Sequence, residues 1–260
     1  MRKASRPTTK SRTAKPAAKA VAKAASVSKT GRAAKTHPKA GTKGASRKSS
    51  AAAASAKKSA SSSGRKTATR PAARLPALTE RDFNPAQRAL VEAIASGPRG
   101  KFDNSGPFAV FLHAPAFGDL AQKLGGYCRL ETSLPPRLSE FAILVTARLW
   151  RAQYEWHAHA PIAAAAGIAA ETIADLGAGR APQRARPDER AIYAFIHELY
   201  RTRRVSDRTY DRVHRLFGDS GMVEFVGLLG YYALVAMSLN VFRMPIPADA
   251  PLPFPEPSSS

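Results

Sequence analysis

The hydrophobic positions between residues 136 and 149 recur at steps of three and four residues, which is the period of an α-helix. The run Phe141–Val145 is apolar without interruption, which indicates a helix that is covered on most of its sides. Glu140 stands directly before that run. A carboxylate beside buried helical turns is costly unless it is paired, protonated or used in chemistry. The pattern therefore predicts a core helix that carries one acid in need of a partner.

A second helix is predicted to follow a break near Arg151. Glu155 and His159 lie one helical turn apart and so share one face of this helix, with His157 between them. Pro161 removes the hydrogen bond that the carbonyl of His157 would otherwise accept, so we expect a bend or an unsatisfied acceptor there. Two acids and two imidazoles on an apolar scaffold are typical of a proton-transfer site.

The same helical periodicity continues on both sides of this pair. Phe108–Leu112 is short and apolar, and because no partner strand is evident we interpret it as buried coil or a helical turn. Asp188 and Ser206 are expected to cap the helices that they precede. The number of helices, without alternating strands, predicts an all-α domain. Helix ends are expected at Gly97, Gly167, Gly177 and Gly218. The other helical stretches are expected around Leu90 to Ile94, Phe117 to Leu130, Ala169 to Leu176, Ala191 to Leu199, Tyr210 to Phe217 and Phe225 to Phe242.

The last of these stretches reaches the length of a membrane span and is uncharged. Two glycines, Ser238 and Asn240 interrupt it, and Glu224 directly precedes it. We therefore expect a buried core helix and no membrane as a partner. The segment Pro245–Pro257 holds six prolines and is expected to lie extended over the surface.

Charge divides the chain into two parts. Residues 1–74 contain 21 Lys and Arg and no Asp, Glu, Phe, Trp or Tyr, whereas the rest holds 20 basic and 19 acidic side chains. The net charge of +22 is therefore a property of the tail. Such a segment cannot bury enough apolar surface to fold alone, so we expect residues 1–74 to be disordered. A linker at 75–82, a helical domain at 83–247 and a Pro/Ser-rich end at 248–260 are expected to follow.

The tail suggests a polyanionic partner. Each Lys or Arg placed on a phosphate releases condensed counterions, so residues 1–74 are suited to salt-sensitive, non-specific binding of nucleic acid. In its Lys, Ala and Pro content the tail resembles those of histone H1-like proteins. Two other interpretations stay open: a solubilising extension without a ligand, and an organelle transit peptide, which is likewise rich in Arg and Ser and poor in acids. No apolar secretory segment is visible, and we expect a cytoplasmic protein.

Cysteine usage and ligand spacing limit the chemistry. Cys128 is the only cysteine, so an internal disulfide and a Cys-x-x-Cys redox pair are excluded, and we expect a buried thiol. Carboxylates and imidazoles suit several divalent ions, and Glu140, Glu155, His157 and His159 are of these types. No His-x-x-x-His or similar ligand spacing stands out, so we expect no metal and no cofactor.

The segment from Glu140 to Gly167 resembles the core motif of the carboxymuconolactone decarboxylase family, which shares its fold with the alkylhydroperoxidase D proteins. The motif here is Glu140, eleven residues, Ala152-Gln-Tyr-Glu-Trp156, then His159 and Gly167. The resemblance spans roughly residues 83–247 and implies an alkylhydroperoxidase D-like helical domain that assembles as a homo-oligomer, a trimer or hexamer. In the peroxidase branch, cysteines match Ala152 and Glu155, so this sequence is similar to the decarboxylase-type branch instead. Flanking segments that fit are Leu112–Pro115, Gly125–Tyr127, Leu134–Arg137 and Gly230–Val235.

The family spacing implies that Glu140, Glu155 and His159 are catalytic. His159, oriented by either acid, is expected to move the proton, while an arginine holds the carboxylate of the substrate. The structural alternatives are a salt bridge from Glu140 to Arg137, Arg148 or Arg151, and a satisfied core histidine at position 159. Candidate substrate-binding residues are His113, Arg148, Arg151, His157, Tyr231 and Asn240.

Three functions follow from these observations. The first is a lyase of the carboxymuconolactone decarboxylase type, acting through a Glu/His proton relay on a small, acidic, unsaturated carboxylic acid or lactone. The second is a non-catalytic member of the fold that its basic tail tethers to nucleic acid. The third, a peroxidase of the alkylhydroperoxidase type, ranks last because the Cys-x-x-Cys pair is absent.

The charge division generates a first prediction. The full chain should bind duplex DNA at low salt, with log affinity falling steeply as log salt rises, because residues 1–74 carry the excess cations. A chain that begins at Leu75 should lose nearly all of this binding in a fluorescence anisotropy titration. Equal affinity of the two chains would show that the tail is not the binding element.

Overall fold

The computed structural model describes residues 72–255. The tail expected to be disordered therefore lies outside the described residues, apart from residues 72–74. Arg74 is held at the end of the last helix, where its backbone N–H donates to the carbonyl of Phe242 over 3.0 Å. Within the described range the elements are helical and no strand occurs, as predicted. They are a 3-10 turn at Glu80–Asp82 and the helices α1 (Pro85–Ala95), α2 (Gly106–Phe111), α3 (Pro115–Leu130), α4 (Pro136–Leu149), α5 (Gln153–Ala165), α6 (Ala170–Gly177), α7 (Pro187–Thr202) and α8 (Asp207–Phe242).

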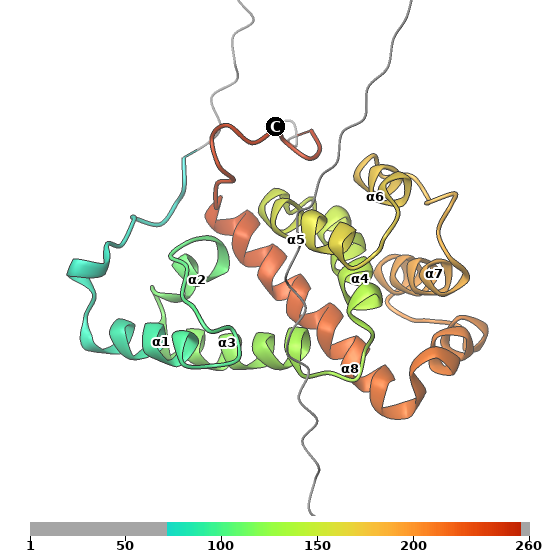
Figure 1. Ribbon diagram of the computed structural model, residues 1–260, viewed down its shortest axis with the longest axis horizontal. Coiled ribbons are helices and arrows are strands. Elements are labelled where there is room, and N and C mark those ends of the chain that lie inside the picture. Colours follow the sequence, from blue (N-terminus) through green and yellow to red (C-terminus); the bar gives the residue numbers. More distant parts are fainter. Residues whose placement is uncertain (1–71, 256–260) are drawn as a thin grey trace, which may run out of the picture. The chain divides into compact units, whose positions relative to one another are not determined.

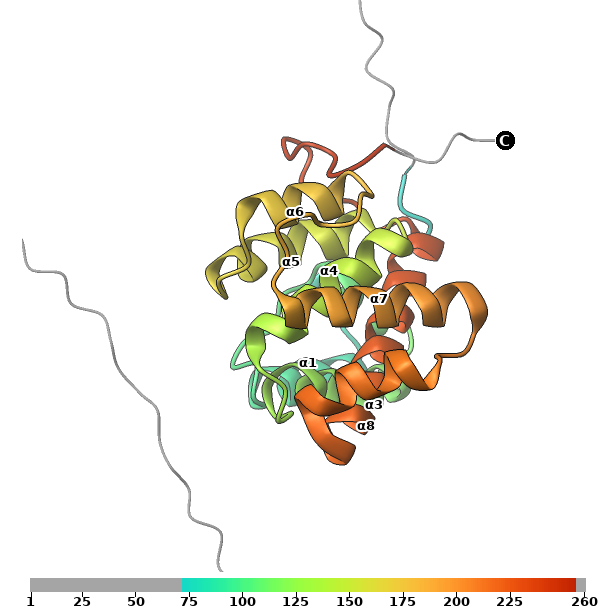
Figure 2. The same cartoon turned by 90° about the vertical axis from the view of Figure 1, so that its right-hand side faces the viewer.

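The long helix α8 divides the domain into two groups of helices. It crosses the middle of the view in Figure 1, with α1 to α3 on one side and α4 to α7 on the other. Figure 2, turned by 90°, shows α7 in front of α4 with α5 and α6 above them. The two groups have separate hydrophobic clusters, and Leu234 of α8 packs against both. One helix thus joins the two halves of the core.

Helix α4 lies at the centre of the larger cluster. Every residue from Leu138 to Ala147 is buried, because α5, α6, α7 and α8 all pack against this helix. The unbroken apolar run Phe141–Val145 predicted a helix covered on most sides, and the structure confirms it. Glu140 belongs to this buried stretch and is only 5% exposed.

The predicted breaks are present at the expected residues. The chain turns sharply between α4 and α5, where Arg151 has a left-handed backbone (φ 53). Gly167 follows the end of α5 with φ 95, and Gly218 interrupts α8 with φ 66. Helix α5 continues through Pro161 as one helix. Phe108–Leu112 proves to be helical and lies mostly within α2.

One predicted cap was wrong. Asp188 is not the N-cap of α7 but its second residue, because the helix begins at Pro187 with Arg186 as N-cap. The backbone N–H of Arg186 donates to Glu189 Oε2 over 2.8 Å. Proline is favoured at the first helical position, where no N–H donor is required. The proline therefore sets the start of α7 two residues earlier than the acidic side chain suggested.

Helix α8 is the one helix in residues 72–255 that is long and apolar enough to cross a membrane by length and composition. Of its apolar window, 44% is buried inside the domain, and its buried side chains include Phe225, Leu228 and Tyr232. Contacts with α2, α3, α4, α5 and α7 account for this burial. In this structure α8 is a core helix.

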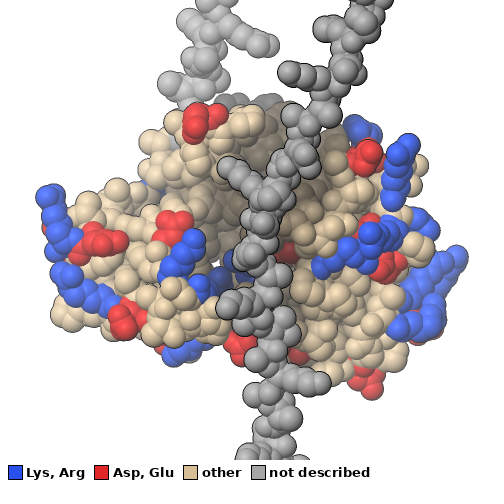
Figure 3. Space-filling model, in the orientation of Figure 1, with Lys and Arg blue, Asp and Glu red and all other residues tan. Residues whose placement is uncertain are grey.

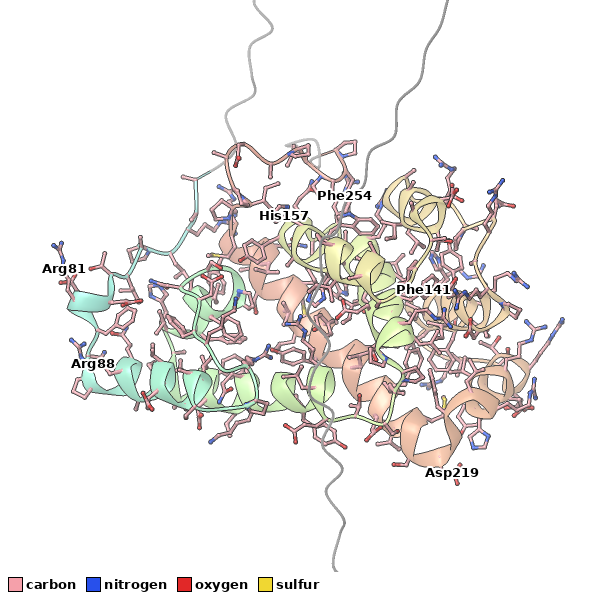
Figure 4. All side chains as sticks on the ribbon, viewed as in Figure 1. Arg81, Arg88, Phe141, His157, Asp219 and Phe254 are labelled. Atoms are coloured by element: carbon pink, nitrogen blue, oxygen red, sulfur yellow. The ribbon has the colours of Figure 1, made fainter. Side chains whose placement is uncertain are left out.

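The C-terminal segment is anchored as well as extended. Up to Pro255 it contains no helix, as its prolines predicted, but it does not simply lie over the surface. Phe254 is buried, with its ring 5.8 Å from that of Trp156, and its carbonyl accepts from Gln153 Nε2 over 2.6 Å. Figure 4 shows Phe254 beside α5. The segment thus covers the first turn of the helix that carries Glu155 and His159.

Two neighbouring glycines of α3 allow a test of how closely α8 packs. A Cβ added to Gly125 would lie 2.1 Å from the hydroxyl oxygen of Tyr231, whereas one added to Gly126 would meet nothing within 4 Å. Gly125→Ala should therefore lower the free energy of unfolding by about 1–3 kcal/mol. Gly126→Ala should raise it by about 0.5–1 kcal/mol, because alanine is the better helix former. Urea denaturation of both variants measures the difference, and equal effects would contradict the close contact between α3 and α8.

Candidate active site

A buried hydrogen bond joins α4 to α5. Glu140 is 5% exposed and His159 is 8% exposed, and Glu140 Oε2 lies 2.7 Å from His159 Nδ1. An ionised carboxylate only accepts hydrogen bonds, so Nδ1 is the donor. In the neutral ring this leaves Nε2 as the nitrogen that accepts a proton. The pair therefore has the orientation of a general base held in one tautomer by a carboxylate.

The arginine beside Glu140 is not one of those expected from the sequence. Arg129 of α3 places Nε 4.0 Å from Glu140 Oε1, on the opposite side of the carboxylate from His159. Of the arginines that were expected to pair with Glu140, Arg137 instead pairs with Asp188 and Glu189 of α7. The other two, Arg148 and Arg151, donate to backbone carbonyls. The correct partner comes from a different helix, which local spacing cannot reveal.

Glu155 occupies the opposite kind of environment. It is 2% exposed, and both of its carboxyl oxygens are buried without a hydrogen-bond partner in residues 72–255. Burial raises the pKa of Glu155 well above its usual value, since desolvation penalises the charged form. The neutral acid is therefore favoured, and it has a proton to donate.

These acid–base groups meet at a cavity of about 430 Å³. Glu155 and His159 line it from α5, Arg129 from α3, and Tyr231 and Tyr232 from α8. The rings of His159 and Tyr232 meet edge to face, with centroids 5.1 Å apart. The volume lies within the range of small-molecule sites. The loop between α1 and α2 supplies the remaining polar wall through Arg99, Lys101, Asp103 and Ser105.

The tyrosines of the cavity are neutral donors. Burial raises the pKa of Tyr231 to about 12 and that of Tyr232 well above its usual range. Tyr154 also lines the cavity, and burial raises the pKa of its hydroxyl, which lies 2.6 Å from Ser105 Oγ. The site thus combines one base, one neutral acid, phenolic donors and cations around one space.

Of the six residues predicted to bind substrate, the structure brings only Tyr231 to this cavity. His113 is exposed in the turn between α2 and α3, and Asn240 donates to the carbonyl of Trp150 over 2.7 Å. His157 is half-buried on α5 and does not line the cavity; Figure 4 shows it near the end of α5 that faces the C-terminal segment. Arg148 and Arg151 line a second cavity instead.

The sequence did not reveal several residues of the cavity wall. Arg99, Lys101 and Ser105 belong to a loop that carries no periodic pattern, and Tyr232 was noted only as a polar group in an apolar helix. Arg99 Nε is buried without a hydrogen-bond partner in the described part of the chain, and its guanidinium lies 5.1 Å from the ring centroid of Phe108. An arginine directly after Gly97-Pro98, at the start of a polar loop, was the signal available for this position.

The same residues do not form a metal site. Between residues 72 and 255, no group of three or more His, Cys, Asp or Glu side chains is arranged to hold an ion. Glu140 and His159 are engaged with each other, and His157 does not line the cavity. The acid–base pair and the cationic residues of the cavity wall are suited to proton transfer and anion binding.

Comparison with known proteins identifies the class of the fold. Residues 115–198 match the model of the Carboxymuconolactone decarboxylase family. This segment runs from α3 to α7 and includes Arg129, Glu140, Glu155 and His159. The match covers only part of the domain, whose fold is all-helical and alkylhydroperoxidase D-like.

Solved structures agree with this fold at low sequence identity. The alkylhydroperoxidase AhpD core of an uncharacterized peroxidase-related protein from Ralstonia eutropha is 15% identical with a TM-score of 0.57, covering 70% of this chain and 95% of that chain. The debrominase Bmp8, as a cysteine-to-alanine variant in complex with 2,3,4-tribromopyrrole, is 12% identical with a TM-score of 0.53, covering 68% and 95%. No curated protein matches the sequence significantly.

The environment of Glu155 generates a prediction about pH. Below its unfolded pKa of about 4.3, the carboxyl is protonated in both the folded and the unfolded chain. As pH rises, the unfolded chain ionises while the folded one keeps its proton, so stability falls until the raised folded pKa is passed. Glu155→Gln removes this pH-dependent loss of stability, because glutamine does not ionise. The variant should match the wild type near pH 4 and then gain on it by about 1.4 kcal/mol per pH unit within that interval.

Urea denaturation of both proteins between pH 4 and pH 8 measures the difference, in which the other titrating groups cancel. A constant difference over this range would show that Glu155 is ionised in the folded protein.

Proposed function

We propose that the domain is an enzyme that decarboxylates a small unsaturated carboxylic acid or lactone by proton transfer. The observation that carries the proposal is that a base and a neutral acid face the same cavity. His159 is held by Glu140 as a base, and Glu155 faces the same space as an unpaired, neutral acid. Two carboxyl groups whose environments push their protonation apart are a recurrent basis for acid and base roles.

Recognition of an acidic substrate has a physical basis in the cavity wall. Three cationic residues, Arg99, Lys101 and Arg129, line it. The acidic residues of the wall are Asp103 and Glu155, and burial favours the neutral form of Glu155. Arginine guanidinium groups suit carboxylates because two N–H groups point in parallel. The substrate carboxylate is therefore placed beside Arg99 and Arg129, with its apolar part against Leu130, Val235 and Leu239.

The reaction then proceeds by loss of carbon dioxide. The bond between the substrate carbon and its carboxylate breaks, and the electron pair left on that carbon delocalises into the conjugated carbonyl. The neutral carboxyl of Glu155 donates a hydrogen bond to the oxyanion that develops there. Nε2 of His159 accepts a proton from water and delivers it to the carbon, while Glu140 stabilises the charge of the intervening imidazolium. The overall change exchanges one carboxylate for one hydrogen.

Peroxide reduction through a disulfide does not fit this chain. Glu155 and Ala152 stand at the motif positions where the peroxidase branch carries cysteines, and Cys128 is the only cysteine. Cys128 is buried in the core, and burial raises the pKa of its thiol, which suppresses the reactive thiolate. The peroxidase and debrominase activities in the names of the similar structures therefore belong to those proteins and are not carried over to this chain.

A second function, binding of nucleic acid without catalysis, is favoured by charge alone. Beyond the basic tail, the junction of α7 and α8 exposes a set of arginines, and Figure 3 shows Lys and Arg side chains gathered at that edge of the domain. Absence of turnover with every carboxylactone offered, together with salt-dependent binding of DNA, would favour this function over the first. The exposed arginines are Arg201, Arg203, Arg204, Arg208, Arg212 and Arg215.

The proton relay is tested by removing its two members singly and together. Glu140→Gln and His159→Ala should each reduce kcat by about 10²–10⁴-fold on a panel of unsaturated carboxylactones, followed by release of carbon dioxide. The double variant should lose little more than either single one, because the two residues act as one unit.

The matched control is His214→Ala. His214 also pairs with a carboxylate at 2.7 Å, Asp219, but at an exposed site on α8 away from the cavity. This variant should keep full activity. Melting temperatures are recorded for all proteins, since variants that melt early but turn over normally per folded molecule would leave Glu140 and His159 a purely structural role.

A further inference from the structure

A second cavity, of about 190 Å³, lies between α4, α6 and α7. Its lining includes Arg148, Arg151 and Arg180 but neither Glu155 nor His159. In Figure 2 α7 lies in front of α4, and α6 lies above them. The two arginines that the sequence suggested for the carboxylate of the substrate are thus brought together elsewhere.

The charge of this cavity is not balanced. Arg180 pairs with Asp175, whose carboxylate lies 2.7 Å from its Nη2. Arg148 and Arg151 pair with no carboxylate in the part of the chain that the structure describes, and each donates to a backbone carbonyl. Two guanidinium groups beside a small space repel each other and attract an anion. Arg148 is half-buried and Arg151 is exposed, and no carboxylate compensates either guanidinium in the described residues. Arginines of this kind are a recurrent feature of anion sites.

Arg148 is also fixed in place before any ligand arrives. Its Nε donates to the carbonyl of Gly177 over 3.0 Å, and its guanidinium lies 5.1 Å from the ring centroid of Phe254. Gly179, with φ 73, leaves room for it: a Cβ there would lie 2.6 Å from Nη2 of Arg148. Arg151 Nη2 is held by the carbonyl of Pro255 over 2.7 Å. A cation that is already ordered loses little entropy on binding.

The rest of the lining indicates the size and kind of anion. Val145, Leu149 and Leu176 form an apolar wall, and Tyr193 adds an aromatic ring. A cavity of about 150 Å³ can hold a benzene ring, so this space has room for a ring or short chain beside the charged group. The ring of His197 lies 4.0 Å from that of Tyr193, and burial lowers the pKa of this imidazole, which favours a neutral hydrogen-bonding group.

We propose that this cavity is a second binding site, for a small organic carboxylate whose apolar body lies on Val145, Leu149 and Leu176 and whose carboxylate contacts Arg148 and Arg151. The site is separate from the proposed active site and does not depend on it. Either can be correct without the other, because they share no lining residue.

The test is a calorimetric titration of the full chain with benzoate. Arg148→Gln and Arg151→Gln should each weaken binding by about tenfold or more, since each removes a charge-assisted hydrogen bond. Arg148→Lys keeps the charge without the guanidinium fork and should fall between the wild type and Arg148→Gln. The matched control is Arg184→Gln, an exposed arginine of the nearby α6–α7 loop that does not line the cavity, which should bind as the wild type does.

One further variant distinguishes the two cavities, and two further ligands test which chemical group is recognised. Arg129→Gln, in the first cavity, should leave this binding unchanged, and loss of binding in that variant alone would place benzoate in the active site and overturn the proposal. Benzamide and inorganic phosphate should both bind at least about tenfold more weakly than benzoate. Equal binding of benzamide would show that the arginines recognise no charge, and equal binding of phosphate would show that the apolar wall contributes nothing. Absence of any benzoate binding to the wild type would also overturn the proposal.

Discussion

The structure depends on a helix without a solvent-facing side. Because α5, α6, α7 and α8 enclose α4, every polar group on its middle turns must find a partner inside the domain. For Glu140 that partner is His159, one helix away, with Arg129 on the other side of the carboxylate. The sharp turn at Arg151 makes this contact geometrically feasible, since it folds α5 back against α4. The packing of the helices around α4 therefore also creates the pair of Glu140 and His159.

The two buried acids show how environment assigns roles to identical chemistry. Glu140 is compensated by an imidazole and a guanidinium, whereas both carboxyl oxygens of Glu155 are buried without a hydrogen-bond partner in residues 72–255. Leaving a buried polar group unpaired destabilises the folded state, and such groups concentrate at functional sites. The fold therefore gives up some stability at Glu155, and what it retains is a carboxylic acid whose pKa burial raises well above its usual value.

Local patterns were enough to predict the helical class, the buried character of α4 and the break before α5, because each of these is encoded by neighbours in the chain. The contact between Glu140 and His159 follows from two predicted helices and a short connection. Arg129, Arg99 and Tyr232 could not be placed in the same way, since they reach the cavity from other helices and from a loop without periodicity. Arg148 and Arg151, predicted to bind substrate, line a different cavity from Glu155 and His159. The direction in which a side chain leaves a turn with φ 53 is set by the backbone and not by distance along the chain.

The first cavity draws its wall from two kinds of sequence. Arg129, Glu155 and His159 of this wall lie within residues 115–198, the segment that matches the family model, as does Glu140 behind His159, whereas Arg99, Lys101, Tyr231 and Tyr232 lie outside it. The buried acid–base groups and much of the surrounding wall are thus encoded on different stretches of chain. Substitutions in the loop between α1 and α2 can change the shape and charge of the cavity without touching the hydrogen bond between Glu140 and His159. The two parts of the wall are free to vary separately, and a match to the family segment describes the buried acid–base groups much better than it describes the loop.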